Sequence, residues 1–537
     1  MLIENSGFVN LFFYVVSAQQ KANTKFRGEH LIMTKLQKLL ATAKTYCVPV
    51  ILLILASQLT TLNQRVVEFP EWVVIIAAIV LIVVNIYLWI KKKGKKLGKI
   101  LIAVVSVIVI LCNTYQAYFS PYWNSYSQRQ TGYVESYDEV ISCEDALEDL
   151  NYVMRYVRKC HPVYLEEDDS KAKVLEASYN EAVEHLKAAD VITVNTLMQE
   201  IQMMLSPLGD GHTFAGGEYE NERYLMDTAY FASEGYEIAA VNGISVEELF
   251  QEKSDLYCYE IEDWGIERMQ GHLKRLGGLA FLGIDSSEIT YSWANQAGEV
   301  IERTYTADDF VPVEEYLQEK EKYFSDDNEA YVYYEIDAEK SLAVLTLEQC
   351  IYNEEYLACL EDMFTEVKEQ SIQNVAVDLR GNGGGNSMVS TAFIRYLDVD
   401  EYRTFTCPII RRGPLNVAGD NTDNVMENQK QTDLLFSGNV YILTDASTFS
   451  AAMDFTDDIQ GNELGIVIGE SPANSPNSYG DITVFATPNT NILFQVSTKK
   501  WLRVNGDETD NIIHPDIECD GRDVYTYLYE EIKNQTM

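Results

Sequence analysis

Residues 375–386 read VAVDLRGNGGGN, in which a short apolar run passes directly into a glycine-rich turn. The apolar run predicts a buried β-strand, because it is short, continuous and bounded by a turn signal. Four of the five residues from 381 to 385 are glycine. Glycine costs backbone entropy, and it serves where φ must be positive or where another group approaches the backbone closely. The stretch therefore predicts a strand that ends in a turn built for close approach.

Three roles are open to this turn. A flexible connection is the simplest of them. A phosphate-binding loop is disfavoured, because the turn has neither the GK[ST] ending nor the GxGxxG spacing. A nest of backbone N–H groups aimed at a developing oxyanion is the third role, and it requires a nucleophile.

The segments around this turn alternate between strand and helix. The predicted strands are SLAVLTLEQC (341–350), NVYILTD (439–445) and GIVIGE (465–470), and the predicted helices are NEEYLACLEDMFTEVKEQ (353–370), MVSTAFIRYL (388–397) and AAMDFTDDIQ (451–460). Alternation of this kind predicts an α/β fold in which helices pack on a layered sheet.

A candidate nucleophile lies in DASTFSAAMDF, residues 445–455, where Ser450 precedes an alanine-rich helix. A serine there is first of all a helix N-cap signal, and the stretch alone favours that role. As a nucleophile, Ser450 would lie beside free N–H groups, and the helix dipole would favour negative charge there. The N–H of Ala451 would be one oxyanion donor, and the glycine turn would supply the other.

A serine nucleophile needs a base, and the chain has only six histidines. His212 lies in GDGHT, a glycine-flanked turn that follows a predicted helix, and functional residues concentrate in such loops. His161, in KCHPVY, precedes a proline and is interpreted as a residue that ends a helix.

Taken together, these motifs resemble one known family. DLRGNGGG, STFSAAMDF and GIVIGE resemble the core of the C-terminal processing (tail-specific) peptidases and of the related tricorn core protease. LSPLGDGHT resembles the N-terminal region of that family, and IIHPDIE resembles its closing motif. The resemblance covers roughly residues 140–525, and it implies a crotonase/ClpP-like layered α/β core with an N-terminal helical cap.

The resembled family divides by its base. One branch uses a lysine soon after the nucleophile, but residues 451–498 contain no lysine or arginine. The other branch uses a histidine from a DGHT-like motif. The resemblance therefore implies a Ser450–His212 pair, in which Ser450 attacks a peptide carbonyl while His212 takes and returns the proton.

The third member of the constellation is open between acids in NGDETDNIIHPD. The spacing to Pro515 favours Glu508, and a slip of one or two residues would select Asp510 instead. An acid there would hold the imidazole's tautomer and stabilise the imidazolium. The alternative is that this acidic cluster only solvates a loop.

The family's oxyanion glycine maps onto Gly384, with Gly383 adjacent, and the N–H of Ala451 completes the hole. The resemblance requires neither a metal nor an organic cofactor. The substrate that it implies is a peptide or a protein.

Three uncharged apolar runs, at 45–63, 73–90 and 100–118, precede this region. Each has about 17–20 residues, about the length that crosses a bilayer as a helix. The basic loop KKKGKK at 91–96 is expected to stay cytoplasmic, which places everything after about residue 120 outside. The chain is thus expected to be a multi-pass cell-membrane protein. The apolar run at 7–18 is too short to span, and Met1 and Met33 are both plausible starts.

The net charge of −41 is unevenly distributed, with +9 on residues 1–120 and −50 on the remainder. A body this acidic repels nucleic acid, so a nucleic-acid partner is excluded.

Five parts are expected. They are a cytoplasmic segment (1–44), a three-helix membrane anchor (45–120), a helical cap with the catalytic histidine (121–227), a mixed insert (228–327) and an α/β peptidase core (328–537). The insert occupies the place where the resembled family carries a PDZ domain, and it is expected to be a degenerate form of one.

The sequence predicts a membrane-anchored extracytoplasmic serine endopeptidase that acts through an acyl-enzyme. The alternative, from another class, is a catalytically silent peptide-binding or sensor module on the same fold. The combination of Ser450, His212 and the glycine turn favours the enzyme, because a binding module needs no such set. A hydrolase of other acyl bonds is a third, weaker hypothesis.

Overall fold

The computed structural model describes residues 45–90, 95–125, 133–324, 330–419 and 424–536, and it divides into two units between Asn124 and Ser125. The predictions for the 1–44 segment, including Met33 and the run 7–18, lie outside the described residues. Most of the basic loop, residues 91–94, also lies outside them.

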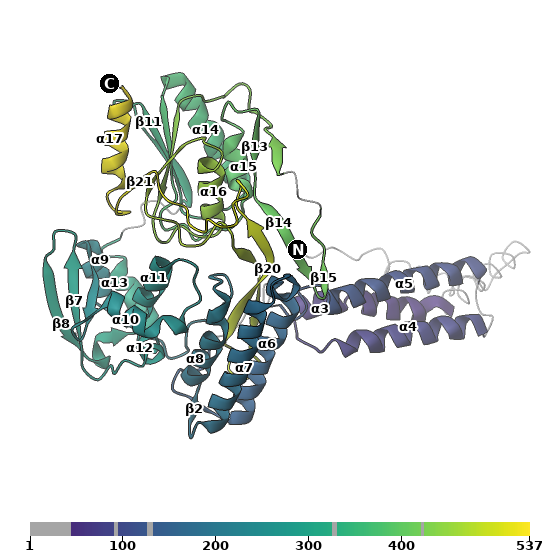
Figure 1. Ribbon diagram of the computed structural model, residues 1–537. Helices are drawn as coiled ribbons and strands as arrows, with labels where there is room; N and C mark the ends of the chain where they lie inside the picture. Colours follow the sequence, from purple (N-terminus) through teal and green to yellow (C-terminus); the bar gives the residue numbers. More distant parts are fainter. Residues whose placement is uncertain (1–44, 91–94, 126–132, 325–329, 420–423, 537) are drawn as a thin grey trace, which may run out of the picture. The chain divides into compact units, whose positions relative to one another are not determined.

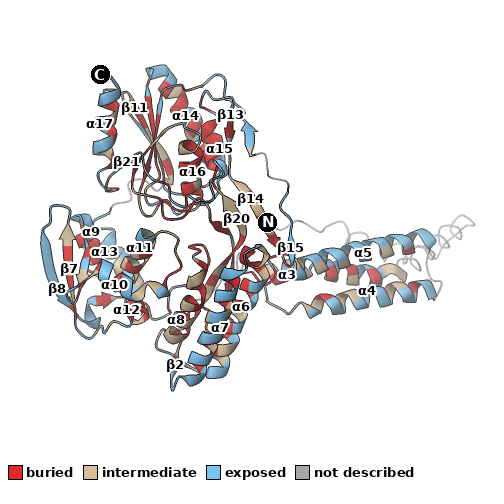
Figure 2. Cartoon of the chain, viewed as in Figure 1, coloured by how far each residue is buried: buried red, intermediate tan, exposed pale blue. Residues whose placement is uncertain are grey.

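The first unit contains three apolar helices. They are Thr45–Arg65, whose last part is α3 (Leu59–Arg65), α4 (Trp72–Ile90) and α5 (Lys96–Tyr118). By length and composition each could cross a membrane, and only 17–22% of the most apolar stretch of each is buried (Figure 2). Asn113 donates a hydrogen bond to the carbonyl of Ala56 at 2.9 Å, and Asn85 donates one to Ser106 at 2.8 Å. Interhelical hydrogen bonds of this kind hold helices together in lipid, so the helices suggest a membrane anchor.

The second unit begins with a helical cap, built from α6 (Cys143–Cys160), α7 (Ser170–Ala188) and α8 (Val194–Leu205). Ser142 caps α6, because its hydroxyl accepts the N–H of Asp145 at 3.0 Å. Two short 3₁₀ helices, η1 (Pro162–Leu165) and η2 (Ser206–Leu208), follow α6 and α8 and lead the chain into its functional loops.

The insert carries a four-stranded antiparallel sheet in the order β6-β5-β7-β8. Its elements are α9 (Thr228–Ser233), β5 (Tyr236–Val241), β6 (Ile244–Ser245), α10 (Val246–Lys253), η3 (Ser254–Leu256), α11 (Glu262–Leu273), α12 (Leu276–Leu282), β7 (Ile289–Asn295) and β8 (Val300–Tyr305). An Asn-Gly turn joins β5 to β6, with φ values of 50° at Asn242 and 81° at Gly243. Flanking segments, β4 (Tyr224–Leu225), β9 (Phe310–Val311) and α13 (Val313–Lys320), complete this region. Cap and insert share one hydrophobic core.

The α/β part is built on a six-stranded sheet in the order β10-β11-β12-β17-β18-β21 (Figure 1). The strands are β10 (Val332–Asp337), β11 (Leu342–Leu347), β12 (Asn374–Asp378), β17 (Asn439–Thr444), β18 (Ile466–Gly469) and β21 (Ile517–Glu518), and all but β10 pair in parallel. Strand β12 is buried throughout, as VAVDL predicts. Val375 and Val377 face one hydrophobic cluster, and Ala376 faces the other.

Helices cover both faces of this sheet. Helices α14 (Glu354–Gln370), α15 (Met388–Ile394) and α16 (Ala451–Gln460) pack on one face, and α17 (Val524–Thr536) packs on the other. The fold is therefore the mixed α/β arrangement that the alternation predicts.

A second sheet links the cap to the α/β part (Figure 1). It consists of β14 (Thr406–Arg412), β15 (Leu415–Asn416), β19 (Tyr479–Ala486) and β20 (Leu493–Leu502), and β3 (Phe214–Gly216) pairs with β20. Phe494 and Val496 of β20 are buried in the core that the cap and insert share. The pairing of β3 with β20 fixes the position of the loop just before β3, which carries His212.

Candidate active site

Ser450 lies in a strained turn between β17 and α16. Its φ of 57° and ψ of −122° are values that a residue with a side chain rarely adopts. The Ser450 N–H donates to the side-chain oxygen of Asn474 at 2.6 Å. The Ser450 side chain makes no capping hydrogen bond to α16. The helix-cap interpretation of this serine is therefore wrong.

The glycine turn approaches this serine as closely as glycine allows. A Cβ at Gly384, whose φ is 95°, would lie 2.7 Å from the Ser450 Cβ and 2.9 Å from the Ala451 nitrogen. Phe449, which precedes the serine, donates its N–H to the carbonyl of Asn382 at 2.9 Å. The close approach predicted from the glycines is confirmed, and it is to Ser450 itself.

The backbone amides beside Ser450 differ in their partners. The N–H of Gly384 donates to the side-chain oxygen of Asn382 at 2.8 Å, so this amide is engaged. Across the described parts of the chain, no hydrogen bond involves the N–H of Gly383 or Ala451. These two amides are the ones available to an oxyanion at Ser450.

The loop before β3 brings Asp210 and His212 together with a residue of the cap. Asp210 is fully buried. Its carboxylate accepts a hydrogen bond from the backbone N–H of His212 at 2.9 Å and one from the ring Nε2–H of His161 at 3.0 Å. Nδ1 of His161 accepts the N–H of Val163 at 3.1 Å, which places the ring proton on Nε2. His161 ends α6 as predicted, but it also holds Asp210, a role that its sequence context did not indicate.

The His212 ring lies against Phe449, the residue that precedes Ser450. Its centroid is 4.3 Å from that of Phe449, and His212 as a whole is only 7% exposed. Neither ring nitrogen has a hydrogen-bond partner among the described residues, so the ring is not hydrogen-bonded to Ser450 in this structure. Nδ1 lies 3.9 Å from the Asp210 carboxylate. Burial lowers the pKa of His212, although the negative charge of Asp210 opposes this, and a low pKa favours the neutral imidazole that a base must be.

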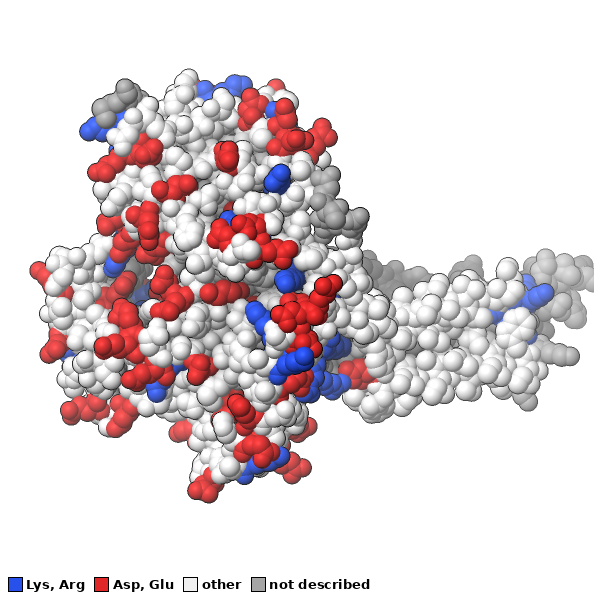
Figure 3. Space-filling model, viewed as in Figure 1, with Lys and Arg blue, Asp and Glu red and all other residues white. Residues whose placement is uncertain are grey.

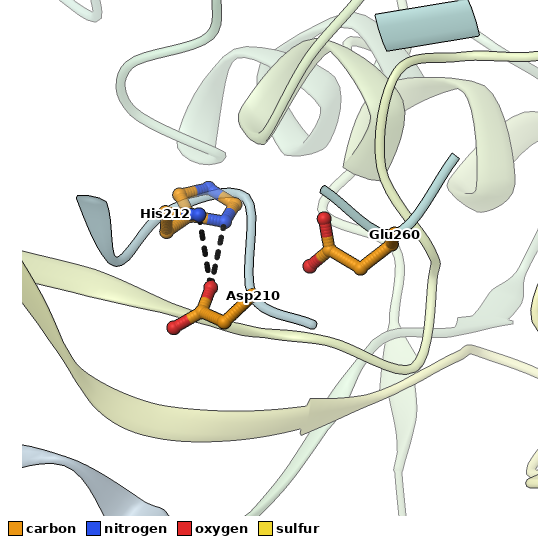
Figure 4. Close-up of side chains that lie close together, drawn as sticks. All are labelled: Asp210, His212 and Glu260. Carbon is orange, nitrogen blue, oxygen red and sulfur yellow. Dashed lines mark hydrogen bonds and ion pairs between the residues drawn. The ribbon is translucent and has the colours of Figure 1, made fainter. Parts of the chain in front are cut away.

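A third acid, Glu260, lies beside this pair (Figure 4). One oxygen of Glu260 accepts the N–H of Gly211 at 3.0 Å, and the other is buried with no hydrogen-bond partner in the described structure. Burial and the negative charge of Asp210 raise the pKa of Glu260 well above its usual range. Burial also raises the pKa of Asp210, but the hydrogen bond from His161 and the nearby imidazoles together hold that pKa well below its usual range.

The acids proposed from the closing motif lie in a different environment. Asp510 forms an ion pair with Arg503 at 2.5 Å, and Arg503 also pairs with Asp457 at 2.8 Å. Glu508 is exposed on the same loop. Within the described ranges, no hydrogen bond or ion pair joins either acid to His212. The carboxylate that faces the imidazole is Asp210.

Asp210, Asn382 and Asn474 were not singled out from the sequence. Asp210 stands two residues before His212 in GDGHT, so the motif itself held a signal for it. Asn474 lies in a loop 24 residues after Ser450, where no pattern indicates that its side chain would reach back to the nucleophile.

A strained serine at a helix N-terminus, two unengaged amides and a buried imidazole nearby are features of serine hydrolases that use covalent catalysis. A family model narrows this class, because residues 341–519, from just before β11 to just after β21, match that of peptidase family S41. The α/β part of the chain therefore matches this family, and the match supports a serine-type peptidase.

Solved structures agree with this fold. The structure of mature CPAF complexed with lactacystin has a TM-score of 0.53 and 13% identity, with 73% of this chain and 97% of that chain covered. A crystal structure of mature CPAF has a TM-score of 0.51 and 13% identity, over 73% and 96%. No curated protein matches the chain.

The contact at Gly384 predicts a sharp sensitivity to one methyl group. Gly384→Ala should lower the reaction rate of Ser450 with a fluorophosphonate probe by about 100-fold or more, because displacing a nucleophile by about 1 Å has that effect. Gly383→Ala is the matched comparison, since a Cβ there would meet no atom within 4 Å. It should lose far less, and equal losses in the two variants would show that the close approach is not the cause.

Proposed function

We propose that this chain is a membrane-anchored serine endopeptidase in which Ser450 is the nucleophile and His212 is the general base. The observation that carries the proposal is the contact between the strained Ser450 turn and Gly384, beside two amides without partners. Strain of this kind costs about 1–3 kcal/mol and persists at functional sites. A silent binding module would have no use for it.

In the proposed reaction the Ser450 hydroxyl attacks the peptide carbonyl while His212 accepts its proton. The oxyanion receives hydrogen bonds from the N–H groups of Gly383 and Ala451 at the N-terminus of α16. The tetrahedral intermediate then collapses to an acyl-enzyme, and His212 returns the proton to the departing amine. Water then attacks the acyl carbonyl while His212 takes its proton, and the Ser450 oxygen leaves with that proton, which releases the acid. The Ser450–His212 hydrogen bond forms in the substrate complex, as catalytic hydrogen bonds often tighten only there.

Three carboxylates are candidates for the acid that orients the imidazole. The motif order of the resembled family proposes Glu508, with Asp510 as its alternative. The geometry proposes Asp210, whose oxygen lies 3.9 Å from Nδ1 of His212 and whose own position is held by His161.

The remaining assignments are proposals of the same kind. We assign the layered sheet with its helices to the crotonase/ClpP-like type, and the insert at 228–327 to the place of a PDZ domain. The five parts keep the boundaries expected from the sequence, and the substrate is a peptide or protein that meets the acidic second unit (Figure 3).

The nucleophile and the base are tested on the full-length chain in detergent micelles. A fluorophosphonate probe should label the wild-type chain, and Ser450→Ala should abolish the labelling because the only reacting hydroxyl is gone. His212→Ala should slow it by about 1,000-fold or more, as the loss of a triad base does. Labelling that survives Ser450→Ala would refute the nucleophile, and a His212→Ala variant with unchanged rate would refute the base.

Three isosteric variants identify the acid. Asp210→Asn should slow labelling by about 100-fold or more, because the imidazolium would lose the carboxylate that faces it. Glu508→Gln and Asp510→Asn should each change the rate by less than a factor of about 3. A thermal melt of each variant controls for folding. A large drop confined to Glu508→Gln would instead assign the role to Glu508.

The proposed orientation places the second unit outside the cell. The basic loop at 91–96 and the three candidate spans support it, since positive loops stay cytoplasmic. A protease added to intact cells should digest the second unit and leave a tag at the N-terminus protected. Protection of the second unit until the cells are permeabilised would reverse the orientation.

A further inference from the structure

Three potential metal ligands converge beside the proposed base. One ligand atom each from Asp210, His212 and Glu260 lies within 4.8 Å of the other two (Figure 4). All three come from loops that other contacts fix, since Asp210 is bonded to His161 and Glu260 to the N–H of Gly211. The convergence is therefore a property of the folded chain and not of mobile surface side chains.

Two of these groups present atoms that lack a protein partner. The His212 side chain is only 8% exposed, and in the described structure neither of its ring nitrogens makes a hydrogen bond. Oε1 of Glu260, the oxygen that does not accept the Gly211 N–H, is also buried without a hydrogen-bond partner in the described structure. Buried polar atoms are nearly always paired, so unpaired ones need an explanation. A ligand atom of each group lies within 4.8 Å of the other's, and a bound cation would satisfy both groups.

We infer that Asp210, His212 and Glu260 form a binding site for a first-row divalent cation of the Zn²⁺ type, and that the bound cation inhibits the peptidase. The inhibition rests on the proposed role of His212, whereas the binding does not.

The ligand set favours zinc over hard cations. One imidazole and two carboxylates, with a fourth position left open, is a zinc-type set, whereas Mg²⁺ and Ca²⁺ prefer oxygen ligands alone. Zn–N and Zn–O distances of about 2.0–2.2 Å put tetrahedral ligands about 3.4 Å apart. Nδ1 of His212 and the Asp210 oxygen are already 3.9 Å apart, so small side-chain rotations close the site. His161 holds the other Asp210 oxygen, as outer partners of metal ligands do.

Metal at Nδ1 would block the proposed base in two ways. It would leave the only ring proton on Nε2, so the ring could no longer accept the proton of Ser450. It would also take the Asp210 oxygen that faces the imidazole. No bond in the substrate is made or broken by the cation, so removing it restores the peptidase.

The test measures binding and inhibition separately on the full-length chain in detergent. Calorimetric titration with Zn²⁺ should give one tight site in the wild-type chain and the same affinity in Ser450→Ala. Glu260→Gln should weaken that affinity by about 100-fold, because the loss even of an outer-shell partner costs 10–100-fold. Glu252→Gln, at an exposed position of α10, is the matched control and should bind like wild type. Mg²⁺ should not compete.

Inhibition is read as the ratio of fluorophosphonate labelling rates with and without Zn²⁺ in each variant. This ratio should fall in the wild type, recover on chelation, and stay near one in Glu260→Gln at the same Zn²⁺ concentration. If a thermal melt shows that Glu260→Gln does not fold, His212→Gln replaces it in the zinc titration and should show the same loss of affinity. The absence of a tight site in Ser450→Ala, or wild-type affinity in Glu260→Gln, would overturn the site. If Ser450 is not the nucleophile, labelling fails while the zinc titration still succeeds, so the two failures are distinguishable.

Discussion

The structure of this site depends on two backbone turns that approach to a distance only glycine permits. Ser450 is held at a φ of 57°, and a Cβ at Gly384 would come within 2.7 Å of the serine's own Cβ. The contacts that hold this arrangement also shape the chemistry. Asn474 accepts the Ser450 N–H and Asn382 accepts the N–H of Gly384, which leaves the amides of Gly383 and Ala451 as the unengaged pair. The strain at Ser450 and the unengaged amides beside it thus arise from the same backbone contacts.

The second requirement is to bring a histidine from the cap to that turn, across more than 230 residues of chain. Strand β20 does this, because it pairs with β3 and with β14 and β19. Gln495 of β20 donates to the His212 carbonyl at 2.8 Å, and the Ser497 N–H donates to Thr213 at 3.0 Å. A slip of one residue in this register would turn every side chain to the other face. The backbone pairing of β3 with β20 therefore fixes the position of His212.

Sequence patterns predicted what depends on neighbouring residues and missed what depends on distant ones. Strand β12, the helix after Ser450 and the close approach at Gly384 each leave a local signal of periodicity, capping or glycine content. The hydrogen bonds from His161 to Asp210 and from the Ser450 N–H to Asn474 leave none, because each joins groups that only the fold brings together. Lys499 and Lys500, the first basic residues after Ser450, are paired with Asp481 and Glu166.

More acidic groups surround His212, the proposed base, than a catalytic triad requires. One carboxylate is enough to orient an imidazole and to balance the imidazolium, but both Asp210 and Glu260 lie within 4.8 Å of His212 and of each other. Two ionised carboxylates at that separation repel by about 3–4 kcal/mol at an effective dielectric constant of 20. The second acid is therefore stable only with a proton or a cation on it. The ring nitrogens of His212 have no hydrogen-bond partner in the described structure, which is what the proposed base needs in order to accept a proton from Ser450. The same unpaired nitrogens can also bind a metal ion. The proposed catalysis and the proposed metal binding thus depend on the same buried nitrogens of His212. The second carboxylate, Glu260, sets how strongly metal binding competes with catalysis.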